Sequence, residues 1–348
     1  MHRQLHFICG LCLLFSGLLT PALVMAQPQS ERHEYEHVAM GVSFRYILYH
    51  EDSKVAEKLF AKAAQRVAEL DSILSDYREQ SETNQLCRSA PHLAPQTVSP
   101  DLYRVVERGL EFNRLTDGAF DVTIGPASHA WRMAIKRRRL PEAEKLEALR
   151  ASIGSDRLRL LPPNQLQLLA PGMQLDFGGI AQGDAADQVA ELFRAAGVTS
   201  ALIDASGDLL AIGAPPGKAG WSIQVPGLSE SDAATLLLRD AAISTSGDRE
   251  QRLIIDGVRY SHIIDPRTAR AVEQSVQATV IAPTATAADA LASALCVLTP
   301  EEGLALIARI PDTAAQLHLP TTSTESASHS SKRQSPNFHR FHVPREER

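Results

Sequence analysis

The sequence of 348 residues has few cysteines and no excess of basic charge. Its four cysteines are too few for a disulfide scaffold of this size, and Cys9 and Cys12 lie in an N-terminal segment that we expect to be removed. The 35 Lys and Arg against 41 Asp and Glu give a net charge of -6, which argues against nucleic acid as a partner. The 44% apolar and 22% charged residues are typical of a globular protein. The sequence leaves open whether Cys87 and Cys296 pair.

Long hydrophobic runs are also missing beyond the N-terminus, where no stretch approaches the roughly 18 apolar residues of a membrane span. Residues 1–26 contain Arg3, an apolar run over 7–19 and a small-residue site ending at Ala26, the pattern of a secretory signal peptide. We expect cleavage after Ala26 and an exported, periplasmic protein. The alternative is an uncleaved N-terminal anchor in the inner membrane.

The rest of the chain predicts one folded domain over residues 34–319. Apolar residues recur at helical spacing over 52–75, and Ser99 followed by Pro100 starts a second helix. Short apolar strands separated by glycine turns follow between 201 and 281, and a helix is expected over 286–298. This order predicts an α+β fold, with a mixed or antiparallel sheet flanked by helices. Residues up to about 33 read as a polar leader, and 321–348 as a disordered tail because they have few apolar residues.

The glycine-rich stretch Asp176–Gly183 stands before an amphipathic helix and could expose backbone N–H groups to a phosphate. It is not a P-loop, because Asp184 occupies the position that requires Lys, and it does not fit the dinucleotide fingerprint. The alternative is a structural turn that lets a strand and a helix approach closely.

Two further positions could carry chemistry. Asp289 and Ser293 share one face of a predicted helix, and such oxygen ligands suit Mg²⁺ held together with a phosphate-bearing ligand, although a tightly packed core helix explains them too. His262 could accept a proton, or could be a histidine of the core. A serine hydrolase is disfavoured because no nucleophile elbow is found.

Taken in order, these segments resemble the ApbE family of flavin transferases over residues 38–319. The segments that carry the resemblance are Met40-Gly41, Ser75–Arg78 with Ser81-Glu82, Thr116–Asp121, Asp176–Gly183, Ser206–Asp208, Thr245–Asp248, Ser261–Thr268 and Ala288–Leu291. The resemblance implies a T-fold-type α+β core. It also implies an exported enzyme that binds FAD with Mg²⁺, joins the FMN half to a Thr hydroxyl of an exported acceptor protein and releases AMP.

The resemblance also assigns the site residues. Those that line the flavin nucleotide site are Met40, Tyr77, Ala119, Phe120, Asp121, Asp176, Gln182 and Ile264. The metal would be held by Asp289, Ser293 and the backbone carbonyl of Gly179, and His262 is the candidate base for the attacking hydroxyl.

The chain departs from the family pattern at several of these positions. Gln182 stands where Lys is common, Cys87 where Asn is common and Ser206 where Gly is common, while Val42, Ala269 and Ser293 are further replacements. The loss of the Lys charge beside a pyrophosphate matters most, because charge-assisted contacts are about twice as strong as neutral ones. Two alternatives therefore stay open: an FAD pyrophosphatase that uses water and yields FMN and AMP, and a non-catalytic FAD-binding protein.

Overall fold

The computed structural model describes residues 30–225, 234–247, 252–255, 257–320 and 330–341. The helices are α1 (Ser53–Leu74), α2 (Glu82–Arg88), α3 (Pro100–Leu115), α4 (Gly125–Arg137), α5 (Ala143–Arg150), α6 (Ala181–Ala195), α7 (Ala285–Leu295) and α8 (Pro300–Ile307), with short 3-10 turns η1 (Ser155–Arg157) and η3 (Phe338–Phe341). The strands are β1 (Glu31–Ala39), β2 (Val42–His50), β3 (Gln96–Thr97), β4 (Leu158–Leu161), β5 (Gln165–Leu168), β6 (Ala201–Ala205), β7 (Asp208–Ile212), β8 (Trp221–Val225), β9 (Ala234–Leu238), β10 (Ala242–Ser246), β11 (Arg252–Ile255), β12 (Val258–Ser261), β13 (Ile264–Asp265), β14 (Arg270–Ala271), β15 (Gln277–Ala282), β16 (Ala314–Pro320) and β17 (Ser330–Gln334).

An eight-stranded sheet organises the molecule, in the order β1-β2-β6-β7-β10-β15-β16-β17 with every neighbouring pair antiparallel. Side chains alternate between its faces: Tyr46 and Leu48 enter the main core, whereas Ile47 enters a second cluster on the other face. Both faces of the sheet are therefore covered, which confirms the α+β expectation.

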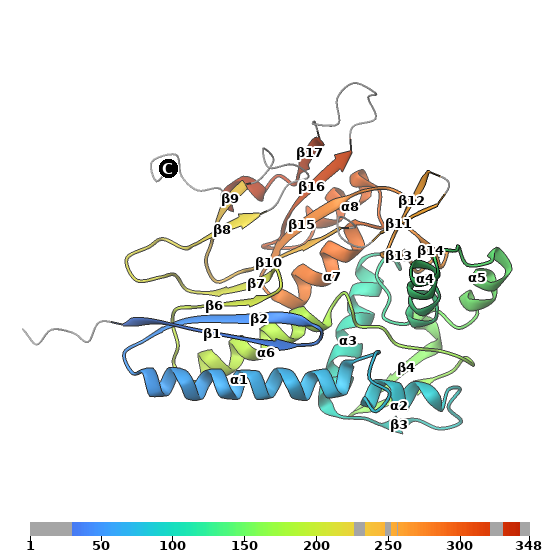
Figure 1. The fold of residues 1–348 in the computed structure, drawn as a ribbon, viewed down its shortest axis with the longest axis horizontal. Helices are drawn as coiled ribbons and strands as arrows, with labels where there is room; N and C mark the ends of the chain where they lie inside the picture. The colour runs from blue at the N-terminus through green and yellow to red at the C-terminus, as the bar shows by residue number, and fades with distance from the viewer. Residues whose placement is uncertain (1–29, 226–233, 248–251, 256, 321–329, 342–348) are drawn as a thin grey trace, which may run out of the picture.

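Different elements cover the two faces. Helix α6 contacts both α1 and α7, and the three helices cover the sheet on one side, whereas β8, β9 and η3 pack on the other (Figure 1). The caps of α1 and α3 follow from the sequence, because Asp52 and Ser99 accept backbone N–H groups of the first turns. The two predicted helices are thus confirmed, with bounds within a few residues of those expected.

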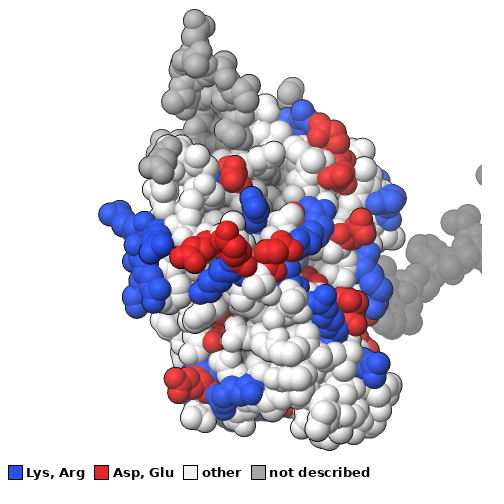
Figure 2. Space-filling model, turned by 90° about the vertical axis from the view of Figure 1, so that its right-hand side faces the viewer, with Lys and Arg blue, Asp and Glu red and all other residues white. Residues whose placement is uncertain are grey.

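A third apolar cluster lies at one end of the sheet, where α4 and α5 pack with the small strands β11, β13 and β14 (Figure 1). Trp131 of α4 stacks on Tyr260 and donates its indole N–H to the carbonyl oxygen of Ala269 at 2.9 Å. This end of the molecule carries His262. Figure 2 shows that acidic and basic side chains are interspersed across the middle of its surface, without a field of one sign.

Both ends of the expected domain need correction. The supposed leader, up to about residue 33, contains the start of β1 (Glu31–Ala39), an edge strand that pairs with β2 along its full length. The tail expected to be disordered holds β17 and η3 in residues 330–341, and Phe338 is fully buried in the second cluster. Strand β17 has few apolar residues because backbone pairing with β16, rather than burial of its side chains, holds it. The expected signal peptide, residues 1–26, lies outside the described residues.

Candidate functional site

The glycine-rich stretch meets helix α7 at the start of helix α6. No side chain caps α6, and its Gly183 N–H donates to Asp289 Oδ2 of α7 at 3.3 Å. A Cβ on Gly183 would lie 2.5 Å from the carbonyl oxygen of Ala285, so only glycine allows this approach. Gly183 therefore permits a close approach, here between two helices rather than the strand and helix expected, and this approach places a helix N-terminus beside Asp289.

The three predicted metal ligands lie around this junction. A Cβ on Gly179 would lie 2.8 Å from Ser293 Oγ, so the backbone of Gly179 adjoins that hydroxyl, and Asp289 is one turn earlier on the same helix. Ser246 Oγ from β10 is 3.3 Å from Ser293 Oγ. Carbonyl, carboxylate and hydroxyl oxygens are a donor set that suits Mg²⁺. The described residues contain no group of three or more His, Cys, Asp or Glu that could hold a metal, and this set has only one such residue.

Asp208, at the start of β7, is the acidic residue that sequence reasoning missed. Burial and the negative charge of Asp208 raise the pKa of the Asp289 carboxyl well above its usual range. Asp208 keeps part of its surface exposed, but its carboxyl group is enclosed, and this burial raises its pKa to about 6. A bound cation would favour ionisation of both groups. The Ser206–Asp208 segment of the resemblance was the available signal.

A second missed acid, Asp187 of α6, orders the start of α7. Its carboxylate accepts the backbone N–H groups of Ala285 and Thr286 at 2.8 and 2.9 Å, and also the Thr286 hydroxyl. Each helix therefore satisfies N-terminal amides of the other, through Asp187 in one direction and Asp289 in the other. This exchange fixes the site between two helix starts.

The other end of the glycine-rich stretch is tied to an arginine that sequence reasoning also missed. Arg132 of α4 contacts Oδ2 of Asp176 and Oδ2 of Asp76, each at 2.5 Å, and its guanidinium lies 4.5 Å from the centre of the Tyr77 ring. Asp176 also accepts the Gly178 N–H at 2.8 Å. The structure thus brings two predicted lining residues, Tyr77 and Asp176, together through Arg132.

Asp121 is a predicted lining residue whose carboxylate is already saturated by the protein. It accepts from Thr123 and Ser155, through both the backbone N–H and the hydroxyl of each, and from the side-chain amide of Asn113. The side chain therefore shapes the turn that presents Ala119 and Phe120. Phe120 Cε2 would lie 3.2 Å from a Cβ on Gly179, which places that ring against the predicted metal site.

The remaining lining residues come from separate elements. Met40 occupies the turn between β1 and β2 with a positive φ of 52°, and Gly41 follows with φ 75°. Gln182 is partly buried in the first turn of α6, and Ile264 is buried in the third cluster. Their assignment to a flavin site stays a prediction.

His262 is exposed between β12 and β13, so the core-histidine interpretation is wrong. Its neighbour Asp265 binds the Arg267 guanidinium at 2.9 and 3.0 Å. Arg267 in turn packs by the Thr116–Gly118 turn, because a Cβ on Gly118 would meet its Cγ at 3.7 Å. Two segments of the resemblance therefore adjoin, whereas Asp248 of another segment lies outside the described residues.

Residues that depart from the family pattern or from the P-loop pattern make defined contacts in the structure. Cys87 and Cys296 are buried and form no disulfide with each other, which answers the open question of their pairing. Cys87 Sγ accepts the Leu175 N–H at 3.3 Å just before Asp176, and burial raises the pKa of this thiol to about 11. Asp184, where a P-loop needs Lys, binds Arg104 through two contacts of 2.8 and 3.1 Å.

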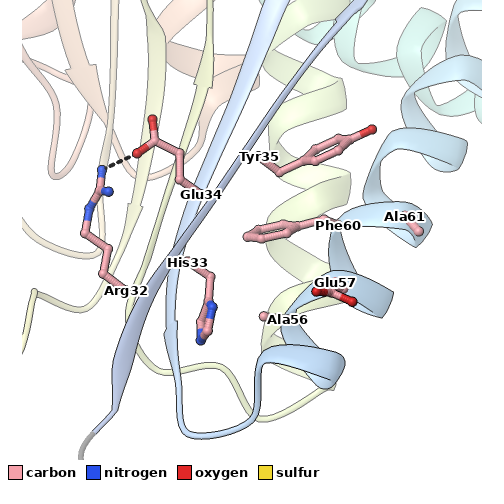
Figure 3. Close-up of a pocket in the computed structure, with 8 residues that line it drawn as sticks. All are labelled: Arg32, His33, Glu34, Tyr35, Ala56, Glu57, Phe60 and Ala61. Carbon is pink, nitrogen blue, oxygen red and sulfur yellow. Dashed lines mark ion pairs between the residues drawn. The ribbon is translucent and has the colours of Figure 1, made fainter.

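A separate pocket of about 420 Å³ lies between β1 and α1, where Tyr35 and Phe60 stack and Arg32 pairs with Glu34 at 2.6 Å (Figure 3). No predicted site residue lines it. Within the described ranges, no helix is both long and apolar enough to cross a membrane.

Comparisons with known proteins identify the family of this chain. Residues 40–317 match the ApbE family. This chain belongs to the ApbE family. It is 30% identical to the FAD:protein FMN transferase of Escherichia coli K12 over 79% of this chain and 80% of the relative. It is 35% identical to the Treponema pallidum enzyme of the same name over 63% and 65%.

Solved structures of ApbE proteins share the fold. The flavin transferase ApbE from Vibrio cholerae superposes with a TM-score of 0.78 at 28% identity, covering 90% of this chain and 99% of that one. The apo form of the Pseudomonas stutzeri flavinyl transferase ApbE gives 0.79 at 28% identity, covering 91% and 98%. These likenesses confirm the expected ApbE-like fold.

Proposed function

We propose that this chain is a FAD:protein FMN transferase, an enzyme that moves the FMN half of FAD to a Thr hydroxyl of an exported acceptor protein and releases AMP. The observation that carries the proposal is the junction where Gly179 adjoins Ser293 and the Gly183 N–H meets Asp289. A helix start and an oxygen donor set meet there, as transfer at a pyrophosphate requires. The names of the E. coli and T. pallidum relatives support the same activity.

Asp289, Ser293 and the Gly179 carbonyl would hold Mg²⁺. When bound, the ion would neutralise charge on the pyrophosphate oxygens. The buried acids support this role, because burial and the nearby charge of Asp208 raise the pKa of the Asp289 carboxyl, and a cation would offset both effects. Backbone N–H groups of the glycine-rich stretch would orient the phosphates.

His262 is proposed to take the proton of the acceptor hydroxyl as its oxygen bonds to the FMN phosphorus and the bond to AMP breaks. Its exposed position between two small strands suits this role, since an acceptor protein must reach the base from outside. Export through the N-terminal segment would bring the enzyme to acceptors in the periplasm.

Two alternatives compete on the same site. Water in place of the acceptor hydroxyl would make the chain an FAD pyrophosphatase. The presence of Cys87 where Asn is common is the departure that favours this alternative. A binder without turnover is favoured by Gln182, which removes a positive charge near the phosphates. Ser206 weighs less, because it lies on an exposed turn with a positive φ of 56°.

Mass spectrometry after incubation with FAD, Mg²⁺ and a Thr-bearing acceptor separates the three functions. Transfer adds FMN to the acceptor and releases AMP, hydrolysis yields free FMN and AMP, and a binder leaves FAD intact. The matched control is the same acceptor with its target Thr changed to Ala. Free FMN in both reactions, with no adduct on either acceptor, would contradict the transferase and support the pyrophosphatase.

A further inference from the structure

Arg132 joins two parts of the proposed flavin site that are far apart in sequence. We call Asp76, Tyr77, Arg132 and Asp176 the Arg132 bridge. One guanidinium nitrogen contacts Asp76 and the other contacts Asp176, while the guanidinium lies 4.5 Å from the centre of the Tyr77 ring. Only a planar, forked cation can bind two carboxylates and cover an aromatic face at once.

The Tyr77 ring needs such a restraint. Its residue is 76% exposed, although the neighbouring Asp76 and Asp176 side chains are largely buried. An exposed ring without support would sample several rotamers, and a ligand would have to bear the entropy of ordering it. With Arg132 against one face, the ring is held while its exposed surface stays available to a planar group.

The same arginine acts on the glycine-rich stretch. Asp176 receives Arg132 on Oδ2 and the Gly178 N–H on Oδ1, and its own N–H donates to the Val122 carbonyl at 2.8 Å. The turn that leads to Gly179 is thereby anchored to α4. Because the two carboxylates already balance its charge, Arg132 is not available as the missing phosphate cation at position 182.

We propose that Arg132 is a positioning residue, which holds the Tyr77 ring and the Asp176–Gly179 turn in a fixed relation. The flavin ring would lie on Tyr77 and the pyrophosphate would reach the glycine-rich stretch, so one rigid bridge sets both ends of the ligand. This inference rests on the proposed function for its ligand, but the bridge itself is tested without one.

The first test compares Arg132→Ala, Arg132→Lys and the control Arg137→Ala, an exposed arginine at the end of the same helix. The KM for FAD and the inhibition constant of ADP, which lacks the flavin ring, are measured for each. We expect Arg132→Ala to raise the KM about tenfold, equivalent to about 1.4 kcal/mol, and to raise the ADP constant by a smaller factor of about two to three, because ADP uses the Asp176–Gly179 turn but not the Tyr77 ring. Arg132→Lys keeps a charge for the carboxylates but not the planar stack, so its KM should stay raised. Equal weakening of FAD and ADP would show a merely structural role and overturn the proposal.

The second test needs no ligand. Hydrogen exchange of backbone amides over 75–78 and 176–180 should be faster in Arg132→Ala than in wild type and in Arg137→Ala. Arg132→Lys should recover much of the protection at 176–180, because its ammonium can still bind Asp176. Unchanged exchange in Arg132→Ala would overturn the bridge. A wild type that neither binds nor cleaves FAD would instead overturn the proposed function, and the exchange result would still decide on the bridge.

Discussion

Two groups of acidic residues differ in how their charges are balanced. In the first group, Asp101 and Asp184 bind Arg66 and Arg104 at 2.5 to 3.1 Å. In the second group, burial raises the pKa of both Asp289 and Asp208, and the ion pairs of the described residues include neither. An acid that the chain neutralises serves the scaffold, whereas an acid left without a cation is suited to a ligand that supplies one.

The largest effect on turnover is expected at Asp289, in the group of acids that has no cation. The change Asp289→Asn keeps the shape but removes the carboxylate proposed to hold Mg²⁺, so FAD cleavage should fall about 10⁴-fold. Stability should not fall, because burial already favours the uncharged form of the Asp289 carboxyl and the amide of Asn is uncharged too. Steady-state release of AMP and a thermal melt measure both effects. Normal turnover in this variant, or in wild type with excess chelator, would show that the metal assignment is wrong.

The next largest effect on turnover is expected at His262, which lies at the surface, unlike Asp289. The change His262→Ala should leave FAD binding intact and lower turnover by about 10²- to 10⁴-fold, the usual effect of a positioned base. Because the side chain is exposed, the melting temperature should not change. His129→Ala, an exposed histidine on α4, is the matched control. Full activity in His262→Ala would remove this residue from the chemistry.

A substitution at Asp101 tests the group of acids that is paired with arginine. The change Asp101→Asn should lower the free energy of unfolding by about 1–3 kcal/mol at pH 7 without changing turnover, because a charge-assisted contact between α1 and α3 is lost. The hydrogen bond from Arg66 holds the pKa of Asp101 to about 2, below its ordinary value of 3.8. This stabilisation is present above about pH 4 and is lost as the pH falls toward 2, so wild type and variant should converge there.

Denaturant titrations over this pH range provide the measurement. Glu111→Gln removes an exposed pair with Arg108 and should cost less than about 0.5 kcal/mol. A gap between wild type and Asp101→Asn that persists at pH 2 would place its origin outside this ion pair.

The smallest effect is expected at Gln182, where a substitution can add a positive charge to the first turn of α6. The change Gln182→Lys should raise turnover by about fivefold, with a smaller gain in FAD affinity, if a charge near the pyrophosphate stabilises the transition state. Gln65→Lys, on the exposed face of α1, controls for added charge. Slower turnover in Gln182→Lys, with a brisk wild type, would show that the site is already compensated and would exclude the pure binder.

Local patterns predicted the elements that depend on neighbours in sequence. Helices α1 and α3 were predicted with their caps, since periodicity and capping residues act over a few positions. Strands β1 and β17 were missed because both are edge strands with polar side chains, and their stability comes from pairing with β2 and β16. Arg132 and Asp187 were missed for a similar reason: their partners lie 44 or more residues away.

By itself the sequence determined the residue types of the site: a glycine-rich stretch before a helix, a carboxylate and a hydroxyl four residues apart, and a histidine before a short strand. Spacing along a helix sets such faces without help from the rest of the chain. Only the tertiary structure decided which acids are enclosed without a cation and which are neutralised by arginine. That outcome depends on burial and on contacts between distant segments, because the environment of a carboxylate, rather than its neighbours in sequence, sets the free energy of its charge.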